Sequence, residues 1–224
     1  MTAPVIAHRT VPRAAVRVIW ALAAAEALIA LVNLSPLIDR YAVGALFDVN
    51  RENTLVVWLA SGLLLAIAAG ACLAASVASG QPDRIGWLVV AAAFVALSAD
   101  ETASLHELAG EIGSRYLEVS WLPSLYLWVV VVAPFAAIGA VWMLFWLRRT
   151  LGRGTTPARL ATLALCAWLL VPAFEALDPT LGGPRLLVVV EESLEAAGEV
   201  MMLAAIALHL AAQGFRVTVS AEPA

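Results

Sequence analysis

Acidic residues recur inside two stretches of the chain that are otherwise apolar. The first reads Leu97-Ser98-Ala99-Asp100-Glu101-Thr102-Ala103-Ser104-Leu105-His106-Glu107, and the second reads Val190-Glu191-Glu192-Ser193-Leu194-Glu195-Ala196-Ala197-Gly198-Glu199. Carboxylates together with an imidazole are ligands for divalent metals. Carboxylates inside a membrane also serve as proton carriers. The residue types therefore indicate metal or proton chemistry.

Helical spacing places the acids of each stretch on one face of a helix. At 100° per residue, the first stretch has four polar residues within about 60°, and the second has three within about 60°. These residues are Asp100, Ser104, Glu107 and Glu111 in the first stretch and Glu192, Glu195 and Glu199 in the second. His106 lies about 120° from Asp100, at the border of its stripe. Two acidic helix faces are predicted to meet.

The composition indicates that these helices cross a membrane. The 224 residues are 62% hydrophobic and 13% charged, with a mean hydropathy of +0.91, whereas about a quarter of a soluble domain is charged. The chain has 13 basic residues, all of them arginine, and 17 acidic residues, for a net charge of −4, which excludes a polybasic nucleic-acid binder. Two isolated cysteines exclude a disulfide scaffold and a zinc ribbon.

The expected fold is an all-α bundle of six transmembrane helices forming a single domain over residues 1–224. Each span needs about 20 mostly apolar residues. The predicted spans are 15–35, 55–79, 85–108, 123–147, 158–177 and 186–211. With these limits, nine arginines fall on the side of both termini and four on the other side. Because positive residues stay in the cytoplasm, both termini are predicted to be cytoplasmic, in a bacterial inner (plasma) membrane.

This topology places the acids of the spans in the outer half of the membrane. Four of them, Glu26, Asp100, Glu195 and Glu199, would together cost on the order of 10 kcal/mol if they faced lipid. They are therefore expected to face one another, water, a cation or a metal. The purely structural alternative is a hydrogen-bonded network of neutral acids that only holds the helices together.

The favoured hypothesis is a divalent metal site, for Zn, Fe or Mn, that is open to the outer face. Its predicted ligands are Asp100, His106, Glu107, Glu192 and Glu195, with Glu101 or Glu199 as a catalytic proton carrier. Such a site could act on a lipid or a redox substrate. His209, about 15 Å along its helix from Glu199, and the tryptophans near span ends, including Trp87 and Trp128, are interpreted as interfacial residues.

Two resemblances bear on this site. Thr102-x-x-x-His106 with Asp100 resembles, weakly, the Ser-x-x-x-His helix of the alkaline ceramidase and adiponectin-receptor superfamily of zinc hydrolases. That family has seven spans and a His pair on its last helix, where this chain has Glu. The chain also resembles bacterial multipass proteins without an assigned activity. That resemblance rests on Phe47-Asp48-Val49-Asn50-Arg51-Glu52-Asn53-Thr54, on Leu97-Ser98-Ala99-Asp100-Glu101 with His106-Glu107, and on Glu191-Glu192 with Glu195; it implies a shared site over residues 40–205.

Two further hypotheses stay open beside the metal centre. One is a proton or cation pathway through Glu26, Glu199, Glu195 and Asp100. The other is a non-catalytic accessory subunit whose acids pair with a membrane partner or with a second copy of the chain. In all three, the surroundings are membrane lipids, and no nucleic acid is involved.

Overall fold

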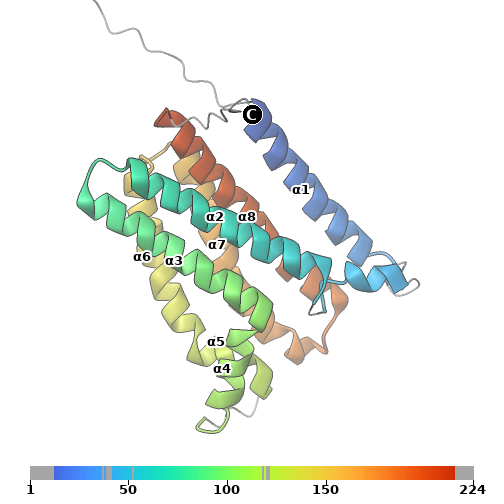
Figure 1. The fold of residues 1–224 in the computed structure, drawn as a ribbon. Helices are drawn as coiled ribbons and strands as arrows, with labels where there is room; N and C mark the ends of the chain where they lie inside the picture. Colours follow the sequence, from blue (N-terminus) through green and yellow to red (C-terminus); the bar gives the residue numbers. More distant parts are fainter. Residues whose placement is uncertain are drawn as a thin grey trace, which may run out of the picture.

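The computed structural model describes residues 13–36, 38, 42–51, 53–117, 119 and 122–214, and its regular elements within these ranges are all helical (Figure 1). The long helices are α1 (Arg13–Asn33), α2 (Leu55–Val77), α3 (Gln81–Ala103), α6 (Ala133–Thr150), α7 (Thr156–Leu177) and α8 (Arg185–Ala212). The short elements are η1 (Ala42–Leu46), α4 (Leu105–Gly113), η2 (Ser124–Leu127), α5 (Trp128–Val131) and η3 (Pro179–Leu181). The predicted all-α class is confirmed.

Five of these helices are long and apolar enough to cross a membrane, namely α1, α2, α3, α7 and α8. They overlap five of the six predicted spans. Much of their apolar surface is exposed, as at Trp20 on α1 and Trp58 on α2, which are 71% and 74% exposed. An exposed apolar surface of this extent suits a lipid environment.

The fourth predicted span, 123–147, is not one continuous helix. It begins with η2 and α5, breaks at Val132, and resumes as α6, in which Pro134 occupies the first turn. Proline is tolerated there because the first backbone N–H groups of a helix have no partner within the helix. Pro134 thus starts α6 instead of kinking a longer helix, whereas Pro172 stays inside α7.

The third predicted span, 85–108, is also interrupted. Helix α3 ends at Ala103, and Ser104 adopts a left-handed conformation (φ 45°, ψ 47°) before α4 begins. The prediction that Asp100, Ser104, Glu107 and Glu111 share one face of a single helix was therefore wrong, because the residues after Ser104 belong to a second helix with a different axis.

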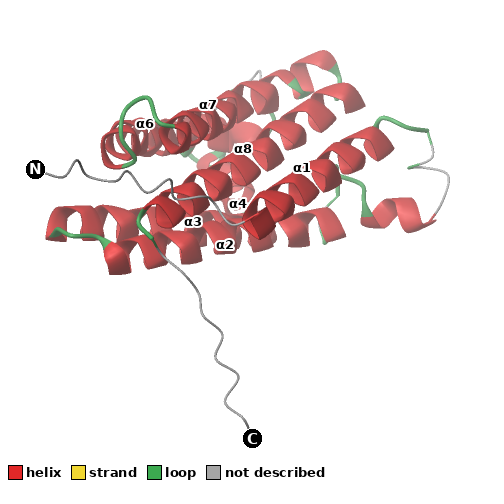
Figure 2. Ribbon diagram, turned by 90° about the horizontal axis from the view of Figure 1, so that it is seen from above, coloured by secondary structure: helices red, strands yellow, loops and turns green. Residues whose placement is uncertain are grey.

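The helices run alternately along the bundle. Helices α1, α3 and α7 end where α2 and α8 begin, and we call this the acidic end; α1 begins and α8 ends at the opposite end (Figure 1). Packing is most extensive between α2 and α3 and between α7 and α8, while α1 packs against α8 (Figure 2). The two chain termini, whose location was predicted, lie outside the described residues.

The half of the bundle towards the opposite end has an aromatic core. Trp87 is 1% exposed and contacts Trp146 and His209, with ring centroids 5.2 and 5.3 Å apart. Phe94 lies 5.5 Å from Trp168 in the same way. The interpretation of Trp87 as an interfacial residue was wrong, because its ring is buried in the core between helices. Trp128 was interpreted in the same way and is also buried, at 9% exposed.

One glycine in this core permits close helix packing and allows a stability test. A Cβ on Gly86 would lie 2.2 Å from Trp146 Cζ2, so Gly86→Ala is expected to lower the free energy of unfolding by about 1–3 kcal/mol through overpacking. Thermal unfolding in detergent measures this loss. Gly139→Ala is the matched control, because open space surrounds Gly139 on α6 and alanine favours a helix. Equal stability of the two variants would contradict the packing.

Candidate functional site

His106 and Asp100 form a bonded pair at the junction of α3 and α4. The backbone N–H of His106 donates to Asp100 Oδ1 (2.8 Å), and His106 Nδ1 donates to Asp100 Oδ2 (2.9 Å). The carboxylate accepts two hydrogen bonds at the N-terminus of α4, where a helix favours negative charge. The break at Ser104 thus brings together two residues that a continuous helix would have kept about 120° apart.

His106 has one aromatic neighbour and two acidic neighbours besides Asp100. Its ring packs against Trp128, with centroids 4.9 Å apart, and Glu175 of α7 and Glu107 act on it electrostatically. Burial alone would lower the pKa of His106, but the hydrogen bond and charge of Asp100, helped by Glu175 and Glu107, raise it above its usual value. The charged imidazolium is therefore favoured at this junction.

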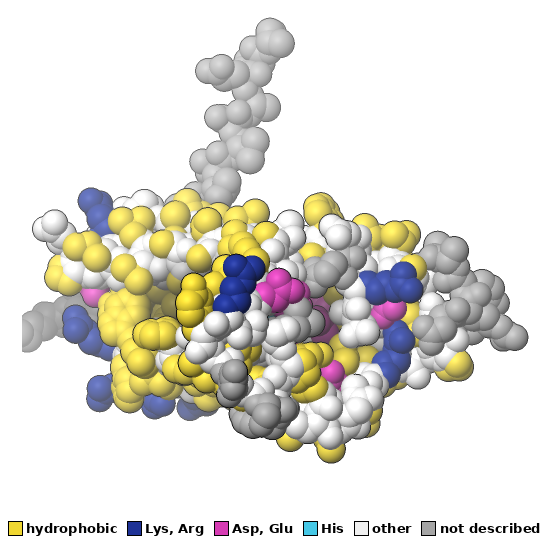
Figure 3. Space-filling model, turned by 90° about the horizontal axis from the view of Figure 1, so that it is seen from below, with side chains coloured by type: hydrophobic (Ala, Val, Ile, Leu, Met, Phe, Trp, Pro, Cys, Tyr) yellow, Lys and Arg dark blue, Asp and Glu magenta, His cyan; other side chains and the backbone are white. Residues whose placement is uncertain are grey.

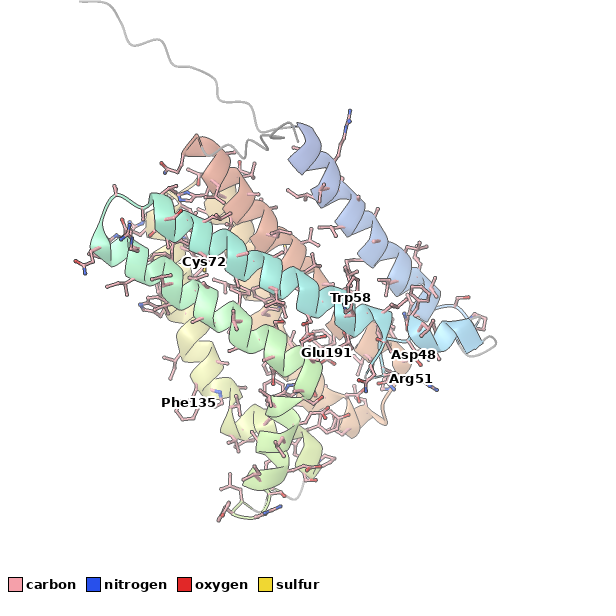
Figure 4. The ribbon with its side chains drawn as sticks, viewed as in Figure 1. Asp48, Arg51, Trp58, Cys72, Phe135 and Glu191 are labelled. Carbon is pink, nitrogen blue, oxygen red and sulfur yellow. The ribbon has the colours of Figure 1, made fainter. Side chains whose placement is uncertain are left out.

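A second pair of acids joins α7 to α8. The carboxyl groups of Glu175 and Glu191 lie close enough to interact electrostatically, and the Trp128 indole lies beside Glu175. Glu191 is 9% exposed and sits among the helices of the bundle (Figure 4). We call Asp100, His106, Glu107, Glu175 and Glu191 the His106 group.

Tyr126 lies beside this group as a neutral neighbour. Its hydroxyl donates to Asp178 Oδ2 (3.2 Å), and burial together with the charge of Asp178 raises the pKa of Tyr126 to about 12. The phenol therefore stays protonated and acts as a fixed donor.

On the other side of α8, four glutamates line a cleft shared by α1, α2 and α8. Glu26 comes from α1, and Glu192, Glu195 and Glu199 come from α8. The cavity measures about 20 Å³, which is room for about one water molecule. Among the residues described, no arginine or histidine lines this α8 cleft.

Glu199 occupies the deep end of the cleft. It is 3% exposed, and within the described structure its Oε2 atom has no hydrogen-bond partner. It lies fourteen residues, about 21 Å, along α8 from Arg185. A buried oxygen without a partner is costly, so its presence calls for an explanation.

The His106 group and the cleft are electrostatically continuous. Glu195 lines the cleft and also interacts electrostatically with four residues outside it, namely Glu101 of α3, Glu175, His106 and Asp100. Glu199 interacts electrostatically with Glu101, Glu195 and Glu26. The result is a chain of carboxyl groups that runs from His106, near the acidic end, to Glu199. Figure 3 shows acidic side chains reaching the surface among hydrophobic and basic ones when the molecule is seen from below.

The seven predicted site residues thus lie in one region, but they do not form a single metal centre. In the part of the chain that the structure describes, no three His, Cys, Asp or Glu residues are grouped so that they could hold a metal ion. The predicted ligands are spread along the chain of carboxyl groups: Asp100, His106 and Glu107 belong to the His106 group, and Glu192 and Glu195 belong to the cleft. The arrangement therefore does not support the predicted metal site.

Three acids in this line of carboxyl groups were not included in the predicted metal site, namely Glu26, Glu175 and Glu191. A signal for two of them is present in the sequence, because Glu175 and Glu191 are each eight residues from Gly183, in the turn between α7 and α8. Antiparallel helices bring such residues to the same level. Glu26 was already part of the predicted proton or cation pathway, as an acid inside an apolar span.

The comparisons with known proteins identify a family. A family model described as Domain of unknown function (DUF8692) matches residues 14–210, and the chain therefore belongs to that family. No curated protein and no solved structure matches the chain.

Proposed function

We propose that this membrane protein moves protons through the chain of carboxyl groups between His106 and Glu199. The observation that carries the proposal is Glu199, a buried acid with an unpartnered oxygen at the end of a line of other acids. Like charges at short range disfavour one another. A line of neighbouring carboxyl groups therefore favours the sharing of protons among them, as in a relay.

The size of the cleft favours protons over larger substrates. A cavity of about 20 Å³ accepts water but is far smaller than sites for organic ligands, which measure roughly 300–1,000 Å³. A lipid substrate would need a different opening. Next to Glu199, helix α8 packs closely against Trp168, whose Cε2 would lie 2.7 Å from a Cβ on Gly198.

The proposed topology has six crossings, with α5 and α6 together forming the fourth. The arginines at the opposite end, among them Arg84, Arg148 and Arg149, outnumber those at the acidic end, among them Arg51 and Arg185. By the positive-inside rule the opposite end and both termini are cytoplasmic. The acidic end then faces the outside of a bacterial inner membrane, and the relay takes up protons there.

Proton flux in liposomes tests the proposal. Wild-type protein reconstituted with a pH gradient, a potassium ionophore and a trapped pH dye is expected to dissipate the gradient, and Glu195→Gln should slow it roughly 10²-fold, the scale of losing a positioned proton carrier. Glu111→Gln is the matched control, because Glu111 is exposed on α4. Wild-type flux no faster than that of protein-free liposomes would rule out the relay.

Metal analysis of the same samples separates the relay from the metal hypothesis. A relay needs no bound metal, so detergent-purified wild type and Glu195→Gln are expected to have the same metal content. Stoichiometric metal in the wild type that is lost in Glu195→Gln would favour a metal centre at the cleft instead.

A further inference from the structure

Three polar residues tie the acidic end of α1 to α8 and to the loop before α2. Arg185 Nε donates to the backbone oxygen of Asn33 (2.7 Å), and Arg185 Nη2 donates to Asn33 Oδ1 (3.1 Å) and Asp48 Oδ1 (3.0 Å). Asn33 is fully buried and Asp48 is 8% exposed. We call Asn33, Asp48 and Arg185 the clasp; Figure 4 shows Asp48 and Arg51 on the loop at this end.

The amide of Asn33 also holds the loop in place. Asn33 Nδ2 donates to the backbone oxygen of Phe47 (2.7 Å), and the backbone N–H of Val49 donates to Asn33 Oδ1 (3.1 Å). One side chain therefore satisfies groups from α1, the loop and α8. Hydrogen bonds that involve a charged group, like those of Arg185, are among the stronger ones in proteins.

An apolar collar lies between the clasp and the glutamates of the cleft. Its members are Ile29, Val49, Val56 and Val189, which all line the cleft. Two of them are bonded to the clasp, since Asn33 Nδ2 donates to the backbone oxygen of Ile29 (2.9 Å) and Asn33 Oδ1 accepts from Val49. Glu26 and Glu192 follow one helical turn deeper than Ile29 and Val189.

Helix α1 is otherwise weakly held. Only 6% of its apolar window is buried, and its packing is against α8. A helix with so few contacts belongs to the low-stability part of a fold. The clasp therefore carries much of what keeps the end of α1, and with it the collar, against α8.

We propose that the clasp closes the outer mouth of the α8 cleft, so that breaking it opens the collar and exposes the cleft to water. The functional role of this closure rests on the proposed function, because opening of the collar would set how fast water delivers protons to Glu192 and Glu199. The geometry of the closure is independent of what the carboxyl groups do.

A cysteine in the cleft reports its opening. Ala196 lines the cleft, so Ala196→Cys is placed in a Cys72→Ser/Cys166→Ser background, which removes the two free thiols. The full chain in lipid nanodiscs is treated with a charged, water-soluble thiosulfonate. Asn33→Ala and Arg185→Gln are each expected to raise the rate of modification about tenfold, the scale of losing hydrogen bonds to a charged group.

Asn50→Ala is the matched control, because Asn50 lies in the same loop with an exposed side chain that makes none of the clasp bonds. In this variant the cysteine at position 196 should be modified at the same rate as in the protein whose clasp residues are unchanged. Unchanged rates in folded clasp variants, or an equal rise with Asn50→Ala, would overturn the closure. If Asn33→Ala does not fold, Asp48→Asn, which keeps an oxygen acceptor, is expected to give a smaller rise, and no rise in Asp48→Asn also overturns it.

The two proposals fail separately. Faster modification without any proton flux in liposomes would leave the clasp as the closure of a cleft that does not conduct protons. Flux that depends on Glu195 while modification stays unchanged would keep the relay and remove the closure.

Discussion

Replacing Glu199 with methionine is expected to make the protein more stable and to abolish its proton flux. Methionine fills a similar volume without polar oxygens, and the buried Oε2 of Glu199 has no partner in the described structure. Leaving such a group buried costs about 1–3 kcal/mol. For a chain of this size, each kcal/mol corresponds to roughly 2–4 °C in unfolding temperature.

The direction of this stability change distinguishes a functional acid from a structural one. If the acids formed a hydrogen-bonded network that locks the helices, removing Glu199 would break it and lower the unfolding temperature. A group that is retained for function at the expense of stability gives the opposite sign.

Thermal unfolding in detergent and flux in liposomes are measured on the same preparation of Glu199→Met. Glu111→Met serves as the control, because an exposed acid on α4 should change stability by no more than about 0.5 kcal/mol. A Glu199→Met protein that is less stable than wild type would assign the acid to the structural network. Unchanged flux would remove Glu199 from the relay.

The part of the site on α8 could be predicted from the sequence because that helix is continuous. Glu192, Glu195 and Glu199 all line one cleft, as their helical spacing predicts. Helix α8 runs for 28 residues without a break, so the periodicity of 3.6 residues holds through all three positions. Its length, about 42 Å at 1.5 Å per residue, also places Glu199 at its middle.

The pairing of Asp100 with His106 could not be predicted in the same way. It depends on one residue, Ser104, in a left-handed conformation that side chains rarely adopt. The sequence does contain a hint, because Ser104 and Glu107 have the spacing of a helix-capping box. The Ser104 side chain makes no capping hydrogen bond, and Asp100 accepts the backbone N–H of His106 instead.

Contacts between distant segments account for the remaining differences. Asn33 is a single amide at the end of an apolar helix, and only the folded chain brings it to Arg185, 152 residues later. The burial of Trp128 beside His106 likewise depends on how η2 and α5 pack against α4. Local patterns carry no information about such partners, because many arrangements of the helices satisfy the same hydropathy.

Asp100→Ala is expected to be the most destabilising change at the site, and its effect should depend on pH. The variant loses two hydrogen bonds, to the backbone N–H and to Nδ1 of His106. A helix cap and a charged hydrogen bond contribute about 1–2 kcal/mol each. Because both side chains are 27% exposed, solvent screening keeps the total near 2 kcal/mol.

The pH dependence follows from the raised pKa of His106 in the folded protein. The stability contributed by the imidazolium is fully present below the unfolded value of about 6.5 and is lost as the pH rises through the folded value. The difference in unfolding temperature between wild type and Asp100→Ala should therefore be larger at about pH 6 than at about pH 9. Part of the loss persists at high pH, because the backbone N–H of His106 has lost its acceptor.

Asp100→Asn separates the two contributions of the carboxylate. An amide oxygen still accepts from the backbone N–H of His106 but carries no charge, so this variant should retain part of the cap and lose the pH-dependent part. His106→Gln should remove the same pH-dependent part from the other side of the pair. If wild type and Asp100→Asn instead lose stability in parallel between about pH 6 and about pH 9, another group titrates in that range, and the charge of His106 does not stabilise the junction of α3 and α4.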